Sequence, residues 1–277
     1  MKPVRLAGVN VAVTGGARGI GLATARAFAA QGATVHVGDI DEGAAHAAAA
    51  EIGGKGYAVD VRSRESFAAF LAAIDGPLDV LVNNAGIMPM GRFVDEDDLI
   101  TDAILDINVR GVLIGAKLAL RGMLARGHGH IVNVASYLGE VPAAGLAGYC
   151  ASKHAVIGFS ESLRDELHGT GVTVTAVLPS AVRTDLVAGV RLGGVLPTVE
   201  PERIADAVVA SCRHRRTLVA VPGWMRGYKI VAALLPDRVL AAVRGGLTRD
   251  RVLHSLDNTA RSAYDARVRR DSADLQR

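Results

Sequence analysis

Short apolar runs rich in β-branched residues alternate along the chain with longer alanine-rich stretches. The short runs are typical of strands buried on both faces of a sheet, and the longer stretches carry apolar residues at helical spacing. Seven strands are predicted, at residues 9–13, 34–38, 56–59, 78–82, 131–134, 172–177 and 217–221. Helices are predicted between them, at residues 20–31, 42–52, 66–74, 99–125, 148–168 and 201–212.

This alternation predicts parallel strands joined by right-handed crossovers. The expected fold is therefore α/β: a single Rossmann-type doubly wound domain with a seven-stranded parallel sheet and helices on both faces. We expect this domain to occupy residues 1–221. The alternation stops after Val221, so residues 222–277 are interpreted as a helical C-terminal extension.

The extension begins with apolar residues at helical spacing. They predict an amphipathic helix that ends at Pro236 and includes Trp224, Met225, Tyr228, Val231 and Leu235. The chain after Arg244 is interpreted as a basic, polar tail. Before the extension, the glycine-rich segment Gly189–Pro197 predicts a mobile lid, with an ordinary surface loop as the alternative.

The composition fits one folded domain. Half of the 277 residues are hydrophobic and 21% are charged, which excludes disorder as the global state. Two cysteines, Cys150 and Cys212, exclude a disulfide-rich scaffold. No transmembrane helix and no signal peptide are predicted, so we expect a cytoplasmic protein with free thiols.

Charge is distributed unevenly along the chain. Residues 201–277 hold 15 basic and 8 acidic side chains, whereas residues 1–200 hold 16 and 20. A basic amphipathic helix can lie on anionic lipid, so one interpretation is peripheral membrane contact through the extension. The interpretation we favour is that its apolar face covers a pocket or a subunit interface.

A glycine-rich turn follows the first predicted strand, with the sequence Thr14-Gly15-Gly16-Ala17-Arg18-Gly19-Ile20-Gly21. Glycines allow a tight turn and let a phosphate approach the backbone. The next helix points its free N–H groups and its positive dipole end at the same place. No Gly-Lys-Ser/Thr follows, so the turn is not a Walker P-loop, and it predicts a pyrophosphate site.

The second predicted strand ends at Asp39. A carboxylate there accepts hydrogen bonds from the adenosine ribose hydroxyls and repels a 2′-phosphate, which favours NAD over NADP. Arg18 favours the opposite, because its cation can pair with a 2′-phosphate. The position also allows Asp39 to cap the following helix. The predicted cofactor is NAD, with NADP less favoured.

Four more motifs follow the glycine turn in a fixed order: Asn83-Asn84-Ala85-Gly86, Asn108 in Ile107-Asn108-Val109, Ser136 after the fifth strand, and Tyr149-Cys150-Ala151-Ser152-Lys153. In this combination the chain resembles the short-chain dehydrogenase/reductase family from Gly8 to about Val221. The resemblance implies an NAD(P)-dependent oxidoreductase that interconverts an alcohol and a ketone or aldehyde. It also implies a homo-tetramer or homo-dimer built through two long central helices.

The predicted catalytic residues are Asn108, Ser136, Tyr149 and Lys153. Tyr149 and Lys153 are four residues apart, so they share a helix face, and a nearby ammonium group lowers the pKa of a phenol. Tyr149 is then the general acid and base, and Ser136 binds the substrate oxygen. By resemblance, Lys153 also binds the nicotinamide ribose, and Asn108 holds a water that links Lys153 to solvent.

The predicted cofactor contacts come from the ends of most of the predicted strands and from the catalytic helix: Gly15, Arg18, Gly19, Ile20, Gly21, Asp39, Ile40, Asp60, Val61, Asn84, Ala85, Gly86, Tyr149, Lys153, Pro179, Val182 and Thr184. The family usually has glycine where this chain has Ser180, and this difference is expected to alter the nicotinamide pocket or the lid.

The segments expected around the substrate are apolar, at residues 87–90, 137–139, 141 and 186–196. They predict an apolar alcohol or ketone, such as a lipid, steroid, retinoid or terpenoid. The alternative function is a non-catalytic NAD-binding sensor or scaffold. No carboxylate or cysteine cluster accompanies His128-Gly129-His130, and no recognition motif accompanies Arg213-His214-Arg215-Arg216, so neither a metal nor a nucleic acid is expected.

Overall fold

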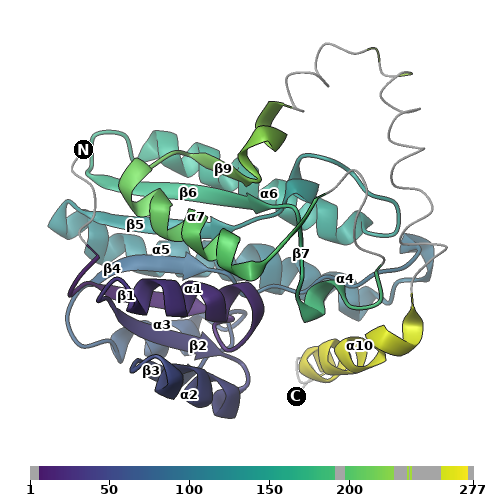
Figure 1. The fold of residues 1–277 in the computed structure, drawn as a ribbon, viewed down its shortest axis with the longest axis horizontal. Helices are drawn as coiled ribbons and strands as arrows, with labels where there is room; N and C mark the ends of the chain where they lie inside the picture. Colours follow the sequence, from purple (N-terminus) through teal and green to yellow (C-terminus); the bar gives the residue numbers. More distant parts are fainter. Residues whose placement is uncertain (1–5, 191–196, 228–235, 237, 239–256, 274–277) are drawn as a thin grey trace.

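A computed structural model describes residues 6–190, 197–227, 236, 238 and 257–273 (Figure 1). Seven parallel strands form the central sheet in the order β3-β2-β1-β4-β5-β6-β9. Their bounds are β1 Asn10–Thr14, β2 Thr34–Asp39, β3 Lys55–Ala58, β4 Leu78–Asn83, β5 Gly129–Val134, β6 Val172–Pro179 and β9 Leu218–Val221. The predicted seven-stranded parallel sheet is confirmed.

Helices cover both faces of this sheet (Figure 1). One face packs against α1 (Gly19–Ala29), α2 (Glu42–Glu51) and α7 (Pro201–His214). The other packs against α3 (Arg64–Ala72), α5 (Gly111–Arg126) and α6 (Ala147–Glu166). The apolar side chains of the strands are buried on both sides, which is why these strands read as continuous apolar runs in the sequence.

The long helix predicted at residues 99–125 has an irregular centre. It consists of α4 (Asp98–Leu105), a π-helical turn at Asp106–Arg110 and then α5. The turn contains Asn108, whose side chain is completely buried. Single π-helical turns of this kind are frequent at functional sites because they redirect one side chain out of the helical register.

A second, two-stranded sheet, not predicted from the sequence, lies at the end of β6. It pairs β7 (Ala181–Val182) in parallel with β8 (Thr198–Val199). The predicted lid at 189–197 lies between these two strands, and its residues 191–196 are outside the described part of the chain. Nothing in the sequence pattern indicated β7 and β8, because two-residue strands have no periodicity.

The predicted helical C-terminal extension is confirmed in part of the described chain, because Asn258–Ala273 form helix α10. The sequence did not predict that the basic, polar stretch after Arg244 contains this helix. The helix predicted to end at Pro236 lies mostly outside the described residues, which include a 3₁₀ turn at Gly223–Met225. Three side chains of α10 are buried: Arg261, Tyr264 and Val268. They have the spacing of a helix face, but only Val268 is aliphatic, so the sequence carries no clear amphipathic pattern here. No helix within the described ranges is long and apolar enough to cross a bilayer.

The turn between β1 and α1 depends on missing side chains. Gly15 has a φ of +61°, in the left-handed region that favours glycine. A Cβ atom at Gly21 would lie 2.1 Å from the carbonyl oxygen of Gly15. The turn and the first residues of α1 are therefore packed backbone against backbone.

We predict that Gly21→Ala lowers the free energy of unfolding by about 3 kcal/mol, because the backbone of the turn must move to admit the methyl group. The matched control is Gly43→Ala in α2, where the nearest atom to an added Cβ is 3.8 Å away. That variant should be as stable as the wild type or about 0.5–1 kcal/mol more stable, since alanine favours helix. Urea denaturation measures both, and equal stability of the two variants would contradict the close packing of the turn.

Candidate active site

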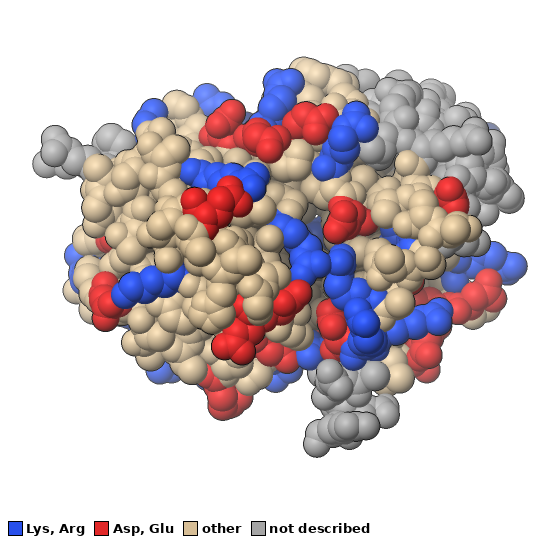
Figure 2. Space-filling view, turned by 60° about the horizontal axis from the view of Figure 1, so that its bottom comes forward, with Lys and Arg blue, Asp and Glu red and all other residues tan. Residues whose placement is uncertain are grey.

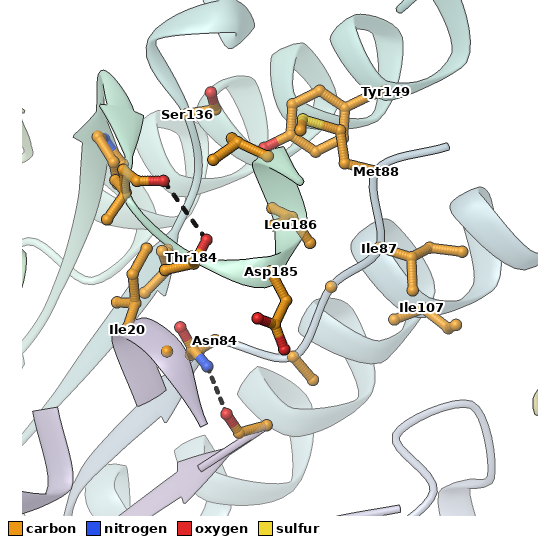
Figure 3. A pocket seen from close by; sticks show the side chains of 18 of the residues that line it. Ile20, Asn84, Ile87, Met88, Ile107, Ser136, Tyr149, Thr184, Asp185 and Leu186 are labelled. Atoms are coloured by element: carbon orange, nitrogen blue, oxygen red, sulfur yellow. Dashed lines mark hydrogen bonds between the residues drawn. The ribbon is translucent and has the colours of Figure 1, made fainter. Parts of the chain in front are cut away.

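A cavity of about 1220 Å³ opens at the carboxyl ends of the strands. It lies where the chain reverses its direction of winding, between β1 and β4, which is where open α/β sheets bind ligands. Nearly all of the sequence-predicted site residues line it: Gly15, Arg18, Gly19, Ile20, Asp39, Ile40, Asp60, Val61, Asn84, Ala85, Gly86, Ser136, Tyr149, Lys153, Pro179, Val182 and Thr184. The other two, Gly21 and Asn108, are not part of the lining. Figure 3 shows part of the lining from close by.

The glycine turn is held in place from the next strand of the sheet. The Asn84 side-chain amide donates to the carbonyl oxygens of Thr14 (3.0 Å) and Gly15 (2.9 Å). In return, the Thr14 hydroxyl accepts from the backbone N–H of Asn84 at 3.1 Å. Helix α1 begins at Gly19 with no side chain bonded to its first N–H groups, so these donors face the cavity unpaired by a cap. Such a helix start is suited to a phosphate anion.

Asp39 closes the turn from the end of β2. Its carboxylate is 8% exposed and accepts hydrogen bonds from the N–H groups of Ala17 (3.1 Å) and Asp41 (3.2 Å). The alternative that Asp39 caps the following helix is wrong, because Asp41 does so by accepting from Ala44 N at 3.0 Å. Asp41 also pairs with Arg18 at 3.0 Å.

At the end of β3, a carboxylate and a guanidinium form a second, tighter pair. Asp60 and Arg62 lie 2.8 Å apart, and the Arg62 side chain is only 6% exposed. Arg62 Nη1 also donates to the backbone carbonyl of Asp271 in α10 at 2.7 Å. Asp60 therefore lines the cavity as predicted, with its charge already balanced by a neighbour.

The predicted catalytic side chains come together from β5, α6 and the π-helical turn. Ser136 follows β5, and Tyr149 and Lys153 lie on the first turns of α6, all three at most 7% exposed. The Lys153 ammonium lies 5.7 Å from the centre of the Tyr149 ring and donates to the Val134 carbonyl at 2.9 Å. Figure 3 shows Ser136 and Tyr149 at the same end of the pocket.

Asn108 connects the loop after β4 to α6. Its amide nitrogen donates to the Ile87 carbonyl (2.9 Å) and to the Ser152 hydroxyl (3.1 Å), and its oxygen accepts from Ile87 N (2.9 Å). All polar groups of the side chain are thus used within the chain. An added Cβ at Gly86 would lie 3.1 Å from the Asn108 oxygen and 3.6 Å from Lys153 Nζ, so Asn108 and Lys153 approach the same stretch of backbone.

Burial dominates the protonation of the two central groups. It raises the pKa of Tyr149 above the ordinary value for a phenol, and the neighbouring Ser136 side chain only partly opposes this rise. Burial also lowers the pKa of Lys153 to about 8. The expectation that the Lys153 cation lowers the pKa of Tyr149 stays a prediction, because burial has the largest effect of the chain's own groups on this pKa.

The segment after β6 folds over the glycine turn. An added Cβ at Gly19 would lie 3.3 Å from the Thr184 methyl group, which shows how closely this segment approaches α1. Ser180 donates through its hydroxyl to the Pro197 carbonyl at 2.6 Å, just before β8. The side chain that departs from the family's glycine therefore joins the segment after β6 to Pro197, the last residue of the predicted lid.

Sequence reasoning missed the contribution of α10 to the cavity. Tyr264, Arg267, Val268, Arg270 and Asp271 all line it. Their spacing within an arginine-rich stretch gave no hydropathy signal. Two other side chains of note are buried: Cys150 packs beside Tyr149, and His130, which was not expected to bind a metal, bonds to Thr173 and Ser211. The described residues contain no cluster of three His, Cys, Asp or Glu side chains arranged to hold a metal.

Comparisons with known proteins agree with this geometry. The family model described as short chain dehydrogenase matches residues 9–193. A 2-(S)-hydroxypropyl-CoM dehydrogenase of Xanthobacter autotrophicus is 38% identical over 210 residues, which cover 73% of this chain and 82% of that protein. Human estradiol 17-beta-dehydrogenase 11 is 32% identical over 250 residues, covering 86% and 82% of the two chains.

Two further matches are a relative that is longer than this chain and a solved structure that has the same fold as this chain. The probable oxidoreductase EphD of Mycobacterium tuberculosis is 34% identical over 262 residues, which are 84% of this chain but 44% of that protein, so the match spans less than half of the relative. A 3-ketoacyl-(acyl-carrier-protein) reductase from Brucella melitensis, solved in complex with NADH, is 28% identical with a TM-score of 0.72. That likeness covers 78% of this chain and 97% of the other. Together with the sheet order and the motifs that line one cavity, these matches show that the chain belongs to the short-chain dehydrogenase/reductase family of oxidoreductases.

Proposed function

We propose that this protein uses a nicotinamide dinucleotide, preferably NAD, to interconvert an apolar alcohol and its ketone or aldehyde. The observation that carries the proposal is the meeting of Ser136, Tyr149 and Lys153 in one cavity with the glycine turn. A turn of this kind binds a pyrophosphate, and a buried phenol beside an ammonium group moves a proton. A non-catalytic dinucleotide sensor requires only the first of these two features.

The residues present fit a dinucleotide. The close backbone packing at Gly15 and Gly21 leaves a side-chain-free cradle at the start of α1. Asn84 holds that cradle, and Asp39 stands at the end of β2, where an adenosine ribose is bound in this kind of fold. When bound, a nicotinamide supplies the site that accepts or donates hydride.

The chain's own residues handle the proton and the oxygen. In the oxidative direction, the Tyr149 phenolate removes the hydroxyl proton, and Ser136 donates a hydrogen bond that orients the substrate oxygen. In the reductive direction, the Tyr149 hydroxyl returns the proton to the developing alkoxide. Lys153 favours the phenolate electrostatically at a distance of 5.7 Å from the ring, and Asn108 fixes the backbone opposite it.

The proposed preference for NAD rests on two charged side chains, Asp39 and Arg18, which have different partners. Asp39 holds a carboxylate at the ribose end of the cavity, where it repels a 2′-phosphate. Arg18, the group that favours NADP, is paired with Asp41 at 3.0 Å. The Arg18–Asp41 pair is partly exposed, so the pairing weakens the attraction of Arg18 for a 2′-phosphate but does not abolish it.

The substrate end of the cavity is apolar. Beside Tyr149 lie Met88, Leu146 and Cys150, with Leu186 and Val187 packed against them. Ser136 and Tyr149 are the polar groups of this end that meet the reacting oxygen in the proposal. An apolar secondary alcohol or ketone therefore fits better than a small charged hydroxy acid.

We also propose a homo-oligomer built through the two long central helices, the one that α4 and α5 form together and α6. Large apolar side chains stay exposed along this part of the chain, at Leu99, Leu105 and Leu124. Phe93 and Val94, just before α4, are 60% and 75% exposed. Large apolar side chains that stay exposed are candidates for a surface that a partner covers.

The proposed role of Tyr149 as general acid and base predicts how activity changes when its phenol oxygen is removed. Tyr149→Phe should lower kcat by about 10²- to 10⁴-fold, because the proton loses its donor and acceptor. NAD affinity, measured by calorimetry, should stay within about twofold of the wild type, as expected for a group that acts on the transition state. Tyr57→Phe, on β3 and outside the cavity lining, is the matched control and should keep full activity. Comparable turnover in the wild type and Tyr149→Phe would contradict the assignment.

The pH dependence follows from the direction of the pKa shifts. Burial raises the pKa of Tyr149, and oxidation needs its deprotonated form. At saturating cofactor, kcat/KM for oxidation should therefore rise as pH increases from 6 through 8, while kcat/KM for reduction stays level there and falls only in the alkaline range. Initial rates in both directions across buffers of constant ionic strength test this. An oxidation rate that is already constant below pH 7 would show that Tyr149 is not the titrating base.

The proposed role of the Asp39 carboxylate predicts that its charge controls the preference for NAD over NADP. Asp39→Asn keeps the size of the side chain but removes its charge, so the ratio of kcat/KM with NAD to that with NADP should fall at least about tenfold. Asp206→Asn removes a charge from the exposed side of α7 and serves as the control. An unchanged ratio in Asp39→Asn would assign the selectivity to another group, with Arg18 the first to test.

A further inference from the structure

Helix α10 lies across the mouth of the cavity and is tied to it at both ends. At its start, Asp257 N donates to the Gly189 carbonyl at 2.9 Å, and the Asp257 carboxylate caps the helix. At its other end, the Asp271 carbonyl accepts from Arg62, which follows β3. Figure 1 shows α10 at the lower right, below α4, with which it is in contact. Figure 2 shows Lys and Arg side chains gathered in the middle of one face of the molecule, beside a hollow.

Arg261 is the centre of this attachment. Its side chain has no exposed surface, although it carries a full charge. The guanidinium donates to the carbonyl oxygens of Leu186 (3.2 Å) and Ala188 (3.3 Å), and also to that of Met88. Asp265 lies 3.1 Å from its Nε atom, and the Tyr264 ring lies 4.7 Å from the guanidinium carbon. A buried arginine is costly unless its donors are satisfied. Here two loops far apart in sequence accept hydrogen bonds from Nη1 and Nη2, while Nε makes no hydrogen bond with any described residue and faces the Asp265 carboxylate.

These two loops form the substrate end of the cavity. Met88 belongs to the segment after β4 and packs with Tyr149, while Leu186 belongs to the segment after β7 and packs on the same group. Tyr264 adds a second bond to the first loop, because its hydroxyl accepts from Met88 N at 2.8 Å. A continuous series of contacts therefore runs from α10 through Met88 to the proposed catalytic phenol.

Two side chains of α10 face the cavity from the same side of the helix. Tyr264 and Val268 are four residues apart, are 6% and 5% exposed, and both line the cavity. The Arg267 guanidinium lies 5.4 Å from the centre of the Tyr264 ring. The part of α10 that lines the cavity therefore combines an aromatic ring and an aliphatic side chain with the charged side chains Arg267, Arg270 and Asp271.

We infer that α10 forms the outer wall of the substrate site, with Tyr264 and Val268 setting the length of apolar substrate that fits and Arg261 acting as a positioning residue for the loops at 86–90 and 184–190. The substrate class in this inference rests on the proposed function. The family model matches residues 9–193, so α10 lies outside the residues that this model matches.

Arg261→Met tests the positioning role without requiring activity. Hydrogen exchange, followed by mass spectrometry, should become about tenfold faster or more in segments 86–90 and 184–190, because each loses a charged hydrogen-bond donor. Arg269→Met changes an exposed arginine of the same helix and should leave these segments unchanged. NAD affinity should remain within about threefold in both variants, since the glycine turn has no contact with Arg261 among the described bonds. Unchanged exchange in Arg261→Met would overturn the positioning role.

Val268→Phe tests the wall itself. With a series of secondary alcohols of increasing chain length, kcat/KM should fall about tenfold or more for the longest members and stay within about twofold for the shortest, because the larger ring takes up space in the cavity. Tyr264→Phe should keep the wild-type length profile and raise KM, since only the bond to Met88 N is lost. A length profile that Val268→Phe leaves unchanged would overturn the assignment of the wall.

Two further outcomes separate this inference from the proposed function. If the wild type oxidises no alcohol, the proposed function fails, and the exchange experiment still decides whether Arg261 positions the loops. If Arg261→Met does not fold, Val268→Phe carries the test through its length profile. A loss of NAD binding in Arg261→Met with unchanged KM for the alcohol would assign α10 to the cofactor and overturn the inference.

Discussion

The close contact between the turn after β1 and the residues after β4 is the constraint on which the site depends. Thr14 and Asn84 exchange hydrogen bonds across the central pair of parallel strands, and this exchange fixes the glycine turn. The winding of the sheet reverses at the same place, so the carboxyl ends of its strands open into one cavity instead of being covered by a crossover. Every other part of the site is positioned relative to this crevice: Asp39 on one side, and Ser136 and Tyr149 on the other.

Burial has opposite consequences at the two ends of the cavity. At the turn, charged side chains are already paired, as in Arg18 with Asp41 and Arg62 with Asp60, so the backbone N–H groups of α1 remain as the anion donors. Around Tyr149 the surroundings are apolar, and burial keeps the phenol protonated while it weakens the charge of Lys153. In the proposed chemistry, the positive ring of a bound oxidised nicotinamide would favour the Tyr149 phenolate and oppose the effect of burial.

The sequence alone was sufficient for the sheet, its covering helices and the residues that line the cavity, because continuous apolar strands and glycine-dependent turns leave strong local signals. It was insufficient where structure depends on a few distant contacts. The β7–β8 pair has only two residues in each strand, and the π-helical turn at Asn108 has no pattern of its own. Helix α10 escaped prediction because its anchor is Arg261, a charged residue that is buried by carbonyl groups from two other loops. The rise that burial causes in the pKa of Tyr149 was not foreseen, since a charge four residues away is visible in a sequence and the depth of burial is not.

The central claim is that the cavity binds a nicotinamide dinucleotide, and the single tryptophan of the chain offers a direct measurement. Trp224 lines the cavity and is 68% exposed, so a reduced nicotinamide bound there lies within range of energy transfer from its indole ring. Titration with NADH should quench the emission of Trp224 in a saturable manner and produce sensitised NADH fluorescence, and an excess of NAD should reverse both changes. Tryptophan emission that stays constant up to millimolar NADH would contradict the account.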